Sequence, residues 1–100
     1  MRLIAWNVLK AYGERHPNAM AALRNWRQLV EAAEWKTPQE AQAAASKAKT
    51  VSASRLRYEI AGGDHRLIVA FNFDRQIAFV KFIGSHAEYD RIDAETVNLF

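Results

Sequence analysis

The hydrophobic pattern of the chain changes near residue 54, and that change restricts the possible folds more than any other feature. Residues 55–60 alternate between polar and apolar side chains, whereas residues 65–73 and 77–84 are almost continuously apolar. The tripeptides GGD and DRQ separate the three runs. Turns this short join neighbouring antiparallel strands. The C-terminal half is therefore predicted to be a three-stranded antiparallel meander.

The turns also predict how the strands pair, because opposed residues of antiparallel strands point to the same face of a sheet. A turn at Gly62 and Gly63 gives the pairs Leu56–Val69, Arg57–Ile68, Tyr58–Leu67 and Glu59–Arg66. A turn at Asp74 and Arg75 gives the pairs Val69–Val80, Ile68–Lys81 and Leu67–Phe82. One face is then apolar and carries Leu56, Tyr58, Ile60, Leu67, Val69, Phe71, Val80 and Phe82.

The opposite face of the predicted sheet collects positive charge. It carries Arg55, Arg57, Glu59, Arg66 and Lys81 among Ile68, Phe79 and Ile83. We expect Arg57, Arg66 and Lys81 to lie near one another, one from each strand. Such a cluster repels itself unless an anion or Glu59 compensates it. This face is therefore a candidate phosphate-binding surface, although Lys81 alone also fits an edge-strand charge that opposes aggregation.

Helical patterns fill the N-terminal half. Three helices are predicted, over about 6–16, 19–34 and 38–48, with Asn18 as the N-cap of the second and the capping box TPQE opening the third. Residues 2–5 fit a short strand or a lead-in to the first helix, and residues 49–54 are expected to be loop. Helices followed by strands predict a single α+β domain over 1–100, with the helices on one face of the sheet.

Composition excludes several classes of site. The sequence contains no cysteine, which excludes disulfides, thiolate metal sites and thiol catalysis. The formal net charge is +3, and residues 47–57 hold four basic side chains without an acid. Such a patch is typical of binding to phosphate or to an acidic partner, or of an ordinary solvated surface. No signal-peptide pattern or membrane-length apolar run is present, so we expect a cytoplasmic protein without a membrane segment.

Proton-transferring side chains directly follow the last predicted strand. Ser85 is expected to cap a short helix that contains His86, Glu88, Tyr89 and Asp90. In metal-free RNA cleavage a base removes the 2′-hydroxyl proton, cations hold the phosphodiester, and an acid protonates the leaving 5′-oxygen. On spacing alone a structural role is the more common one for such a pair, with His86 bonded to backbone and Tyr89 packed on the sheet.

The other titratable residues suggest no second site. His65 is expected at the surface beside a turn, and His16 at a helix end. The acids Glu88, Asp90, Asp93 and Glu95 lack the spacing of metal ligands, so we expect no metal site.

The segment HRLIVAFNFDRQIAFVKFIGSHAEYDRID, preceded by ERHPNAMAALRNW and AEWKTPQEA, resembles the HigB family of toxins from bacterial toxin–antitoxin modules, within the RelE/ParE superfamily. The resemblance covers nearly the whole chain in order. Its most specific parts are the pattern G-[ST]-H-x-E-Y-D at 84–90 and the strand motif [YH]-R-L-I at 65–68. Only the terminal TVNLF and the alanine-rich residues 41–49 fall outside it.

The resemblance implies a small antiparallel sheet with helices on one face, and a metal-independent endoribonuclease that uses no cofactor. Such toxins cut mRNA, generally on the ribosome. A HigA-like antitoxin with a helix-turn-helix domain silences them and carries the pair to operator DNA. The resemblance assigns Arg66 and Lys81 to the scissile phosphate, and His86 and Tyr89 to proton transfer and base stacking. The RNA-binding surface is expected to include Arg55, Arg57 and Lys49.

Two other functions fit the same fold. ParE-like relatives resemble inhibitors of DNA gyrase that bind without cutting RNA. A plain RNA- or protein-binding module would hold phosphates on its basic face without forming a product. The presence of His86 and Tyr89 beside the cations favours RNA cleavage, because a gyrase inhibitor does not need that pair.

Overall fold

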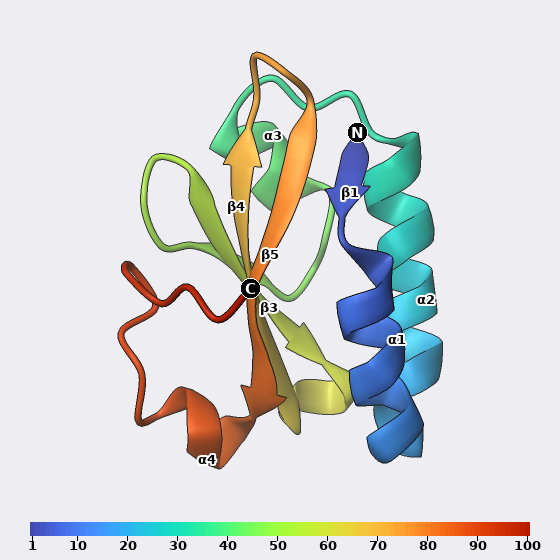
Figure 1. The fold of residues 1–100 in the computed structure, drawn as a ribbon. Helices are drawn as coiled ribbons and strands as arrows, with labels where there is room; N and C mark the ends of the chain where they lie inside the picture. Colours follow the sequence, from blue (N-terminus) through green and yellow to red (C-terminus); the bar gives the residue numbers. More distant parts are fainter.

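The computed structural model describes residues 1–100 as a five-stranded mixed sheet with helices packed against it (Figure 1). The strands are β1 (Arg2–Ile4), β2 (Ala48–Thr50), β3 (Arg55–Ile60), β4 (His65–Asn72) and β5 (Ile77–Ser85). The helices are α1 (Trp6–Arg15), α2 (Pro17–Ala32), α3 (Pro38–Ala43) and α4 (His86–Tyr89), and a 3-10 turn, η1, covers Ala61–Gly63. The predicted α+β class is confirmed. Even α2, with 16 residues, is too short and too polar to span a membrane.

The predicted meander of β3, β4 and β5 is confirmed as the centre of the sheet, whose strand order is β1-β5-β4-β3-β2. The N-terminal strand β1 pairs parallel to β5, with Ile4 opposite Phe79. The prediction of a loop from residue 49 is wrong at its start, because Lys49 and Thr50 belong to β2 and pair antiparallel with β3. This short edge strand satisfies backbone groups of β3 that a loop would leave unpaired.

The register between β4 and β5 differs from the predicted one by a bulge. All predicted pairs of β3 with β4 are confirmed, and so is Val69 opposite Val80. Beyond that point Ile68 pairs with Phe82 and Leu67 with Ile83, so the predicted pairs Ile68–Lys81 and Leu67–Phe82 are wrong. One extra residue in β5 opposite the Ile68–Val69 step explains the shift, because a bulge inserts a residue into only one strand.

The core lies between the sheet and the helices α1 and α2. The helices contribute Leu9, Tyr12, Ala19, Leu23, Trp26 and Val30, and the sheet contributes Leu56, Tyr58, Ile60, Leu67, Val69, Phe71, Ala78, Val80 and Ile83. The predicted apolar face is thus correct except at its last position, where Ile83 replaces Phe82. Phe82 is buried outside this cluster, together with Ile68. We call the sheet face that carries these two residues, opposite α1 and α2, the open face.

The second helix begins earlier than predicted. It starts at Pro17, which occupies the first helical position, so Asn18 lies inside the helix and is not its cap. The third helix begins with the predicted capping box of Thr37 and Glu40 but already ends at Ala43. Its buried surface consists of Ala41 alone, too little to stabilise a longer helix.

His65 is buried, contrary to the surface position that the sequence predicted, and only 6% of it is exposed. The Tyr12 hydroxyl lies 2.7 Å from His65 Nδ1, and Asn18 Oδ1 lies 3.1 Å from His65 Nε2. A neutral imidazole with its proton on Nε2 satisfies both contacts, accepting from Tyr12 and donating to Asn18. The ring of Tyr12 also stacks on His16, with centroids 4.2 Å apart. These contacts join α1 and α2 to β4.

We expect the free energy of unfolding to decrease as the pH falls below about 6.5, the ordinary pKa of histidine. Burial lowers the pKa of His65, and His16 lowers it further, while Asp64 and Glu88 oppose them. The unfolded chain therefore binds the proton at a pH where folded His65 is still neutral, and acid favours unfolding. Urea denaturation between pH 5 and 8 measures this dependence. A His65→Gln variant should show a flatter profile, and an equally steep profile would contradict the assignment.

Candidate active site

Helix α4 is fixed to the end of β5 by its own cap and by the turn before β4. Glu88 N donates to Ser85 Oγ (3.1 Å) and Ser85 N donates to Glu88 Oε1 (2.8 Å), which is the predicted cap in the form of a capping box. The hydrogen bonds from Ser85 lower the pKa of Glu88. His86 N also donates to Asp64 O (3.0 Å). The side chains of this short helix therefore have defined positions beside the open face.

A buried aromatic ring forms the floor beneath α4. The bulge turns Phe82 to the open face, where its ring centroid lies 6.5 Å from that of Tyr89. Gly84 leaves the space for this ring, because a Cβ at position 84 would lie 2.6 Å from Phe82 Cζ. Any larger residue at position 84 would displace the ring, which accounts physically for the glycine before Ser85.

Two arginines lie close to the Tyr89 ring on the open face. The guanidinium carbon of Arg57 lies 6.0 Å from the ring centroid, and that of Arg66 lies 5.9 Å from it. Cations at this distance are attracted to the negative face of an aromatic ring. Tyr89 is half-buried, so the ring also remains accessible from solvent. The structure thus brings Arg57, Arg66 and Tyr89 together.

Arg66 is the structural cation of this group. Only 8% of its side chain is exposed, and its Nη2 lies 3.4 Å from Glu59 Oε1. Its Nη1 donates to the carbonyl oxygen of Gly63 and, at 3.4 Å, to that of His65. These contacts neutralise the guanidinium and hold it in place. The sequence predicted that an anion or Glu59 compensates the basic cluster, and in the structure Glu59 is the ion-pair partner of Arg66.

Arg57 is the cation that is left without a partner. Its side chain is half-buried and makes no hydrogen bond or ion pair within the chain, and its Nε is buried without a partner. It stands opposite the exposed Lys49 of β2 in the sheet. A guanidinium in this setting has donors available for an anion. Lys49 adds a second positive charge to the same part of the open face.

His86 and Asp90 form an exposed pair on the outer side of α4. His86 Nδ1 lies 3.1 Å from Asp90 Oδ2, and the two side chains are 55% and 60% exposed. A proton on Nδ1 that is donated to the carboxylate leaves Nε2 as the basic nitrogen. The sequence pattern predicted a role for His86 in proton transfer but did not predict Asp90 as its partner. Their separation of four residues on a helix was the available signal.

Lys81 and Arg55 contact the end of the chain instead of the Tyr89 group. The Lys81 ammonium donates to Asn98 Oδ1 (3.1 Å) and lies 5.4 Å from the Phe79 ring centroid. Arg55 Nη1 donates to the carbonyl oxygens of Ala94 (3.1 Å) and Val97 (2.7 Å). Of the basic residues expected on this face, two therefore surround Tyr89 and two hold the C-terminal segment.

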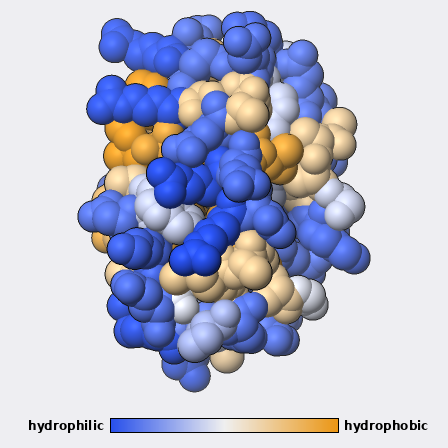
Figure 2. Space-filling model, turned by 90° about the vertical axis from the view of Figure 1, so that its right-hand side faces the viewer, coloured by the Kyte–Doolittle hydropathy of each residue, from blue (hydrophilic) through white to orange (hydrophobic).

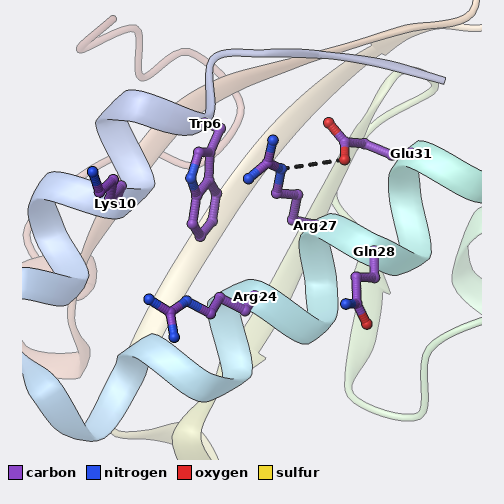
Figure 3. Close-up of a pocket in the computed structure, with 6 residues that line it drawn as sticks. All are labelled: Trp6, Lys10, Arg24, Arg27, Gln28 and Glu31. Carbon is purple, nitrogen blue, oxygen red and sulfur yellow. Dashed lines mark hydrogen bonds and ion pairs between the residues drawn. The ribbon is translucent and has the colours of Figure 1, made fainter.

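A separate cationic groove of about 430 Å³ lies on the helical side of the molecule and contains none of the expected site residues. Its lining residues are Trp6, Lys10, Arg24, Arg27, Gln28 and Glu31, from α1 and α2 (Figure 3). Arg27 pairs with Glu31 at 3.2 Å and lies 4.8 Å from the Trp6 ring, whereas Lys10 and Arg24 are exposed and make no ion pair. Figure 2 shows that hydrophilic side chains dominate this side.

Comparison with known proteins agrees with the resemblance seen in the sequence. The family model HigB_toxin, described as the RelE-like toxic component of a toxin–antitoxin system, matches residues 19–92. The protein named mRNA interferase HigB from Escherichia coli O6:H1 is 27% identical over 94 residues, which cover 92% of this chain and 91% of that protein. The matched range includes Arg57, Arg66, His86 and Tyr89. Because the family model covers well over half of the chain, the protein belongs to the HigB family of RelE-like toxins from toxin–antitoxin systems.

Proposed function

We propose that this toxin cleaves mRNA with its own side chains and without a metal ion. One observation carries the proposal: the guanidinium carbons of Arg57 and Arg66 lie 6.0 and 5.9 Å from the centroid of the Tyr89 ring, and the same short helix with its C-cap carries the exposed pair of His86 and Asp90. An aromatic ring, cations and a basic nitrogen are thus available to one RNA strand. The related protein named mRNA interferase supports the same substrate.

In the proposed reaction His86 Nε2 removes the proton of the 2′-hydroxyl. The 2′-oxygen attacks the adjacent phosphorus and the bond to the 5′-oxygen breaks, which leaves a 2′,3′-cyclic phosphate and a 5′-hydroxyl. Asp90 holds the imidazole in one tautomer and stabilises its charged form. The Tyr89 hydroxyl is the candidate acid for the leaving oxygen, and its ring is a stacking surface for a base.

The cations divide into a phosphate ligand and a positioning residue. Arg57 makes no ion pair, so we assign it to the scissile phosphate, with Lys49 on the adjacent nucleotide backbone. Arg66 was assigned to that phosphate from the resemblance. Its burial and its contact with Glu59 favour a positioning role, in which it orients the Tyr89 ring. Lys81 and Arg55 are proposed phosphate contacts that become available when the C-terminal segment moves.

The antitoxin is proposed to be a HigA-like protein with a helix-turn-helix domain. The toxin–antitoxin pair is proposed to bind operator DNA only through this domain. Action on mRNA, with the ribosome as the expected location, requires a cytoplasmic protein. The cationic groove between α1 and α2 suits an acidic segment of the antitoxin, since Lys10 and Arg24 there have no ion-pair partner. Docking there would leave the open face to RNA or to a second part of the antitoxin.

Replacement of His86 by alanine is expected to lower the rate of mRNA cleavage by about 10²- to 10⁴-fold, the usual contribution of a general base. Asp90→Asn should lower it less, because the imidazole remains. The rates are measured with purified protein and mRNA, with and without ribosomes. Arg75→Ala, in the exposed turn between β4 and β5, is the control and should retain the full rate. A folded His86→Ala protein that cleaves normally would exclude this role, and trapping of gyrase without RNA product would support the ParE-like alternative.

The roles of Arg57 and Arg66 can be distinguished when stability and cleavage are measured on the same variants. Arg57→Ala is expected to abolish cleavage while the free energy of unfolding changes by about 0.5 kcal/mol or less. Arg66→Ala should reduce cleavage and also destabilise the fold by about 1–3 kcal/mol, because Glu59 and two carbonyl oxygens lose a buried donor. Urea denaturation and product formation give the two readouts. Normal cleavage by Arg57→Ala would contradict its assignment to the phosphate.

A gene next to the toxin gene is expected to encode the antitoxin, and its co-expression should suppress growth arrest. The double variant Lys10→Glu, Arg24→Glu should remain toxic, because the groove lies apart from the open face, but the antitoxin should rescue it poorly. Colony counts with and without the antitoxin measure both effects. Arg75→Glu is the matched charge-reversal control. Full rescue of the double variant would show that the antitoxin does not use the groove.

A further inference from the structure

The C-terminal segment, residues 93–100, turns back over the open face after α4. Figure 1 shows it returning from α4 to the middle of the sheet, in red. Leu99 N donates to the backbone oxygen of Lys81 (3.0 Å), in β5. The family match ends at residue 92, so this segment follows the part of the chain that the family model describes.

The same segment occupies two cations that were expected to bind RNA. Arg55 Nη1 donates to the carbonyl oxygens of Ala94 and Val97, and the Lys81 ammonium donates to the side-chain amide oxygen of Asn98. Each acceptor is an uncharged oxygen. A phosphate oxygen is the stronger acceptor for the same donors, because its negative charge adds Coulomb attraction to a guanidinium or an ammonium and because a phosphate can accept two parallel N–H bonds from an arginine.

Little apolar burial secures the segment. No residue of 93–100 belongs to the hydrophobic core, and the side chains of Leu99 and Phe100 are 59% and 52% exposed. The polar contacts to Arg55, Lys81 and the β5 backbone are therefore its main anchors. Segments with few buried apolar contacts open at low free-energy cost. Exchange of these anchors for RNA phosphates is thus possible without unfolding the domain.

From these contacts we infer that residues 93–100 form a displaceable strap, which competes with the RNA backbone for Arg55 and Lys81. This inference rests on the proposed function, and it adds a regulatory element to the same site. While the strap holds Arg55 and Lys81, Arg57 and Lys49 are the two of these four cations whose side chains have no hydrogen-bond or ion-pair partner. When a strand enters, its phosphates replace Ala94, Val97 and Asn98 as acceptors, and the binding surface extends from two cations to four.

The test compares the full chain with a chain that ends at residue 92. The probe is a single-stranded 2′-O-methyl RNA, which lacks the attacking hydroxyl and therefore binds without being cut. Removal of the strap should lower Kd by about 3- to 10-fold, the value of one or two competing hydrogen bonds. Asn98→Ala, which loosens only the Lys81 contact, should lower Kd by about 2-fold. Because Asn98→Ala keeps the full chain, it tests the inference even if the shortened chain folds poorly.

A double-variant comparison identifies the groups for which the strap competes. In the background Arg55→Ala, Lys81→Ala, removal of residues 93–100 should tighten RNA binding much less than in the wild type, because both contested cations are absent and only the loss of the Asp93 and Glu95 charges remains. An unchanged or higher Kd after removal in the wild-type background would overturn the inference. The same titrations with heparin separate this outcome from failure of the proposed function. Heparin is a polyanion whose binding needs no nuclease site. Tighter heparin binding that depends on Arg55 and Lys81, without any RNA binding, would therefore retain the strap and reject the function.

Discussion

The extra residue in β5 determines the geometry on which the site depends. Strict alternation would direct Phe82 to the helices and Ile83 to the open face. The bulge opposite Ile68 and Val69 reverses the two, so that Ile83 enters the core and Phe82 lies beneath Tyr89. Bulges often redirect side chains next to functional sites. Because Gly84 then faces the ring of Phe82, α4 can begin close to the sheet and bring Tyr89 within about 6 Å of both arginines.

The pairing of β3 with β4 was predictable, whereas the bulge was not. Residues 55–60 alternate clearly and a tight turn follows, so only one register buries Leu56 and Tyr58 together. Phe82 and Ile83 are both apolar, and a slip of one residue leaves the hydrophobic pattern of β5 unchanged. The edge strands β1 and β2 have three residues each, too few to show a period. They form because the neighbouring strand offers unpaired backbone groups.

The position of the candidate site was predictable from its local signals, but the partners within it were not. Ser85 directly after the apolar run predicted the N-cap of α4 and with it the positions of His86 and Tyr89, and the structure adds Glu88 as the second member of a capping box. The burial of Arg66 depends on Glu59 and on the turn at Gly63, so it requires the folded sheet. His65 is a clearer case, because its partner Tyr12 lies 53 residues away in the chain. No local pattern contains that contact.

The cations of the open face differ in whether their partners can be exchanged. Glu59 is a charged partner of a buried guanidinium, so removing it would leave Arg66 with an uncompensated charge in a poorly solvated position. The partners of Arg55 and Lys81 are neutral oxygens on a mostly exposed segment, and water or phosphate can replace them at little cost. The proposed function therefore has Arg66 keep Tyr89 oriented whether or not RNA is bound, and has Arg55, Arg57 and Lys81 adapt to the RNA backbone. A fixed cation beside exchangeable ones allows one small sheet to combine a preorganised site with an adjustable binding surface.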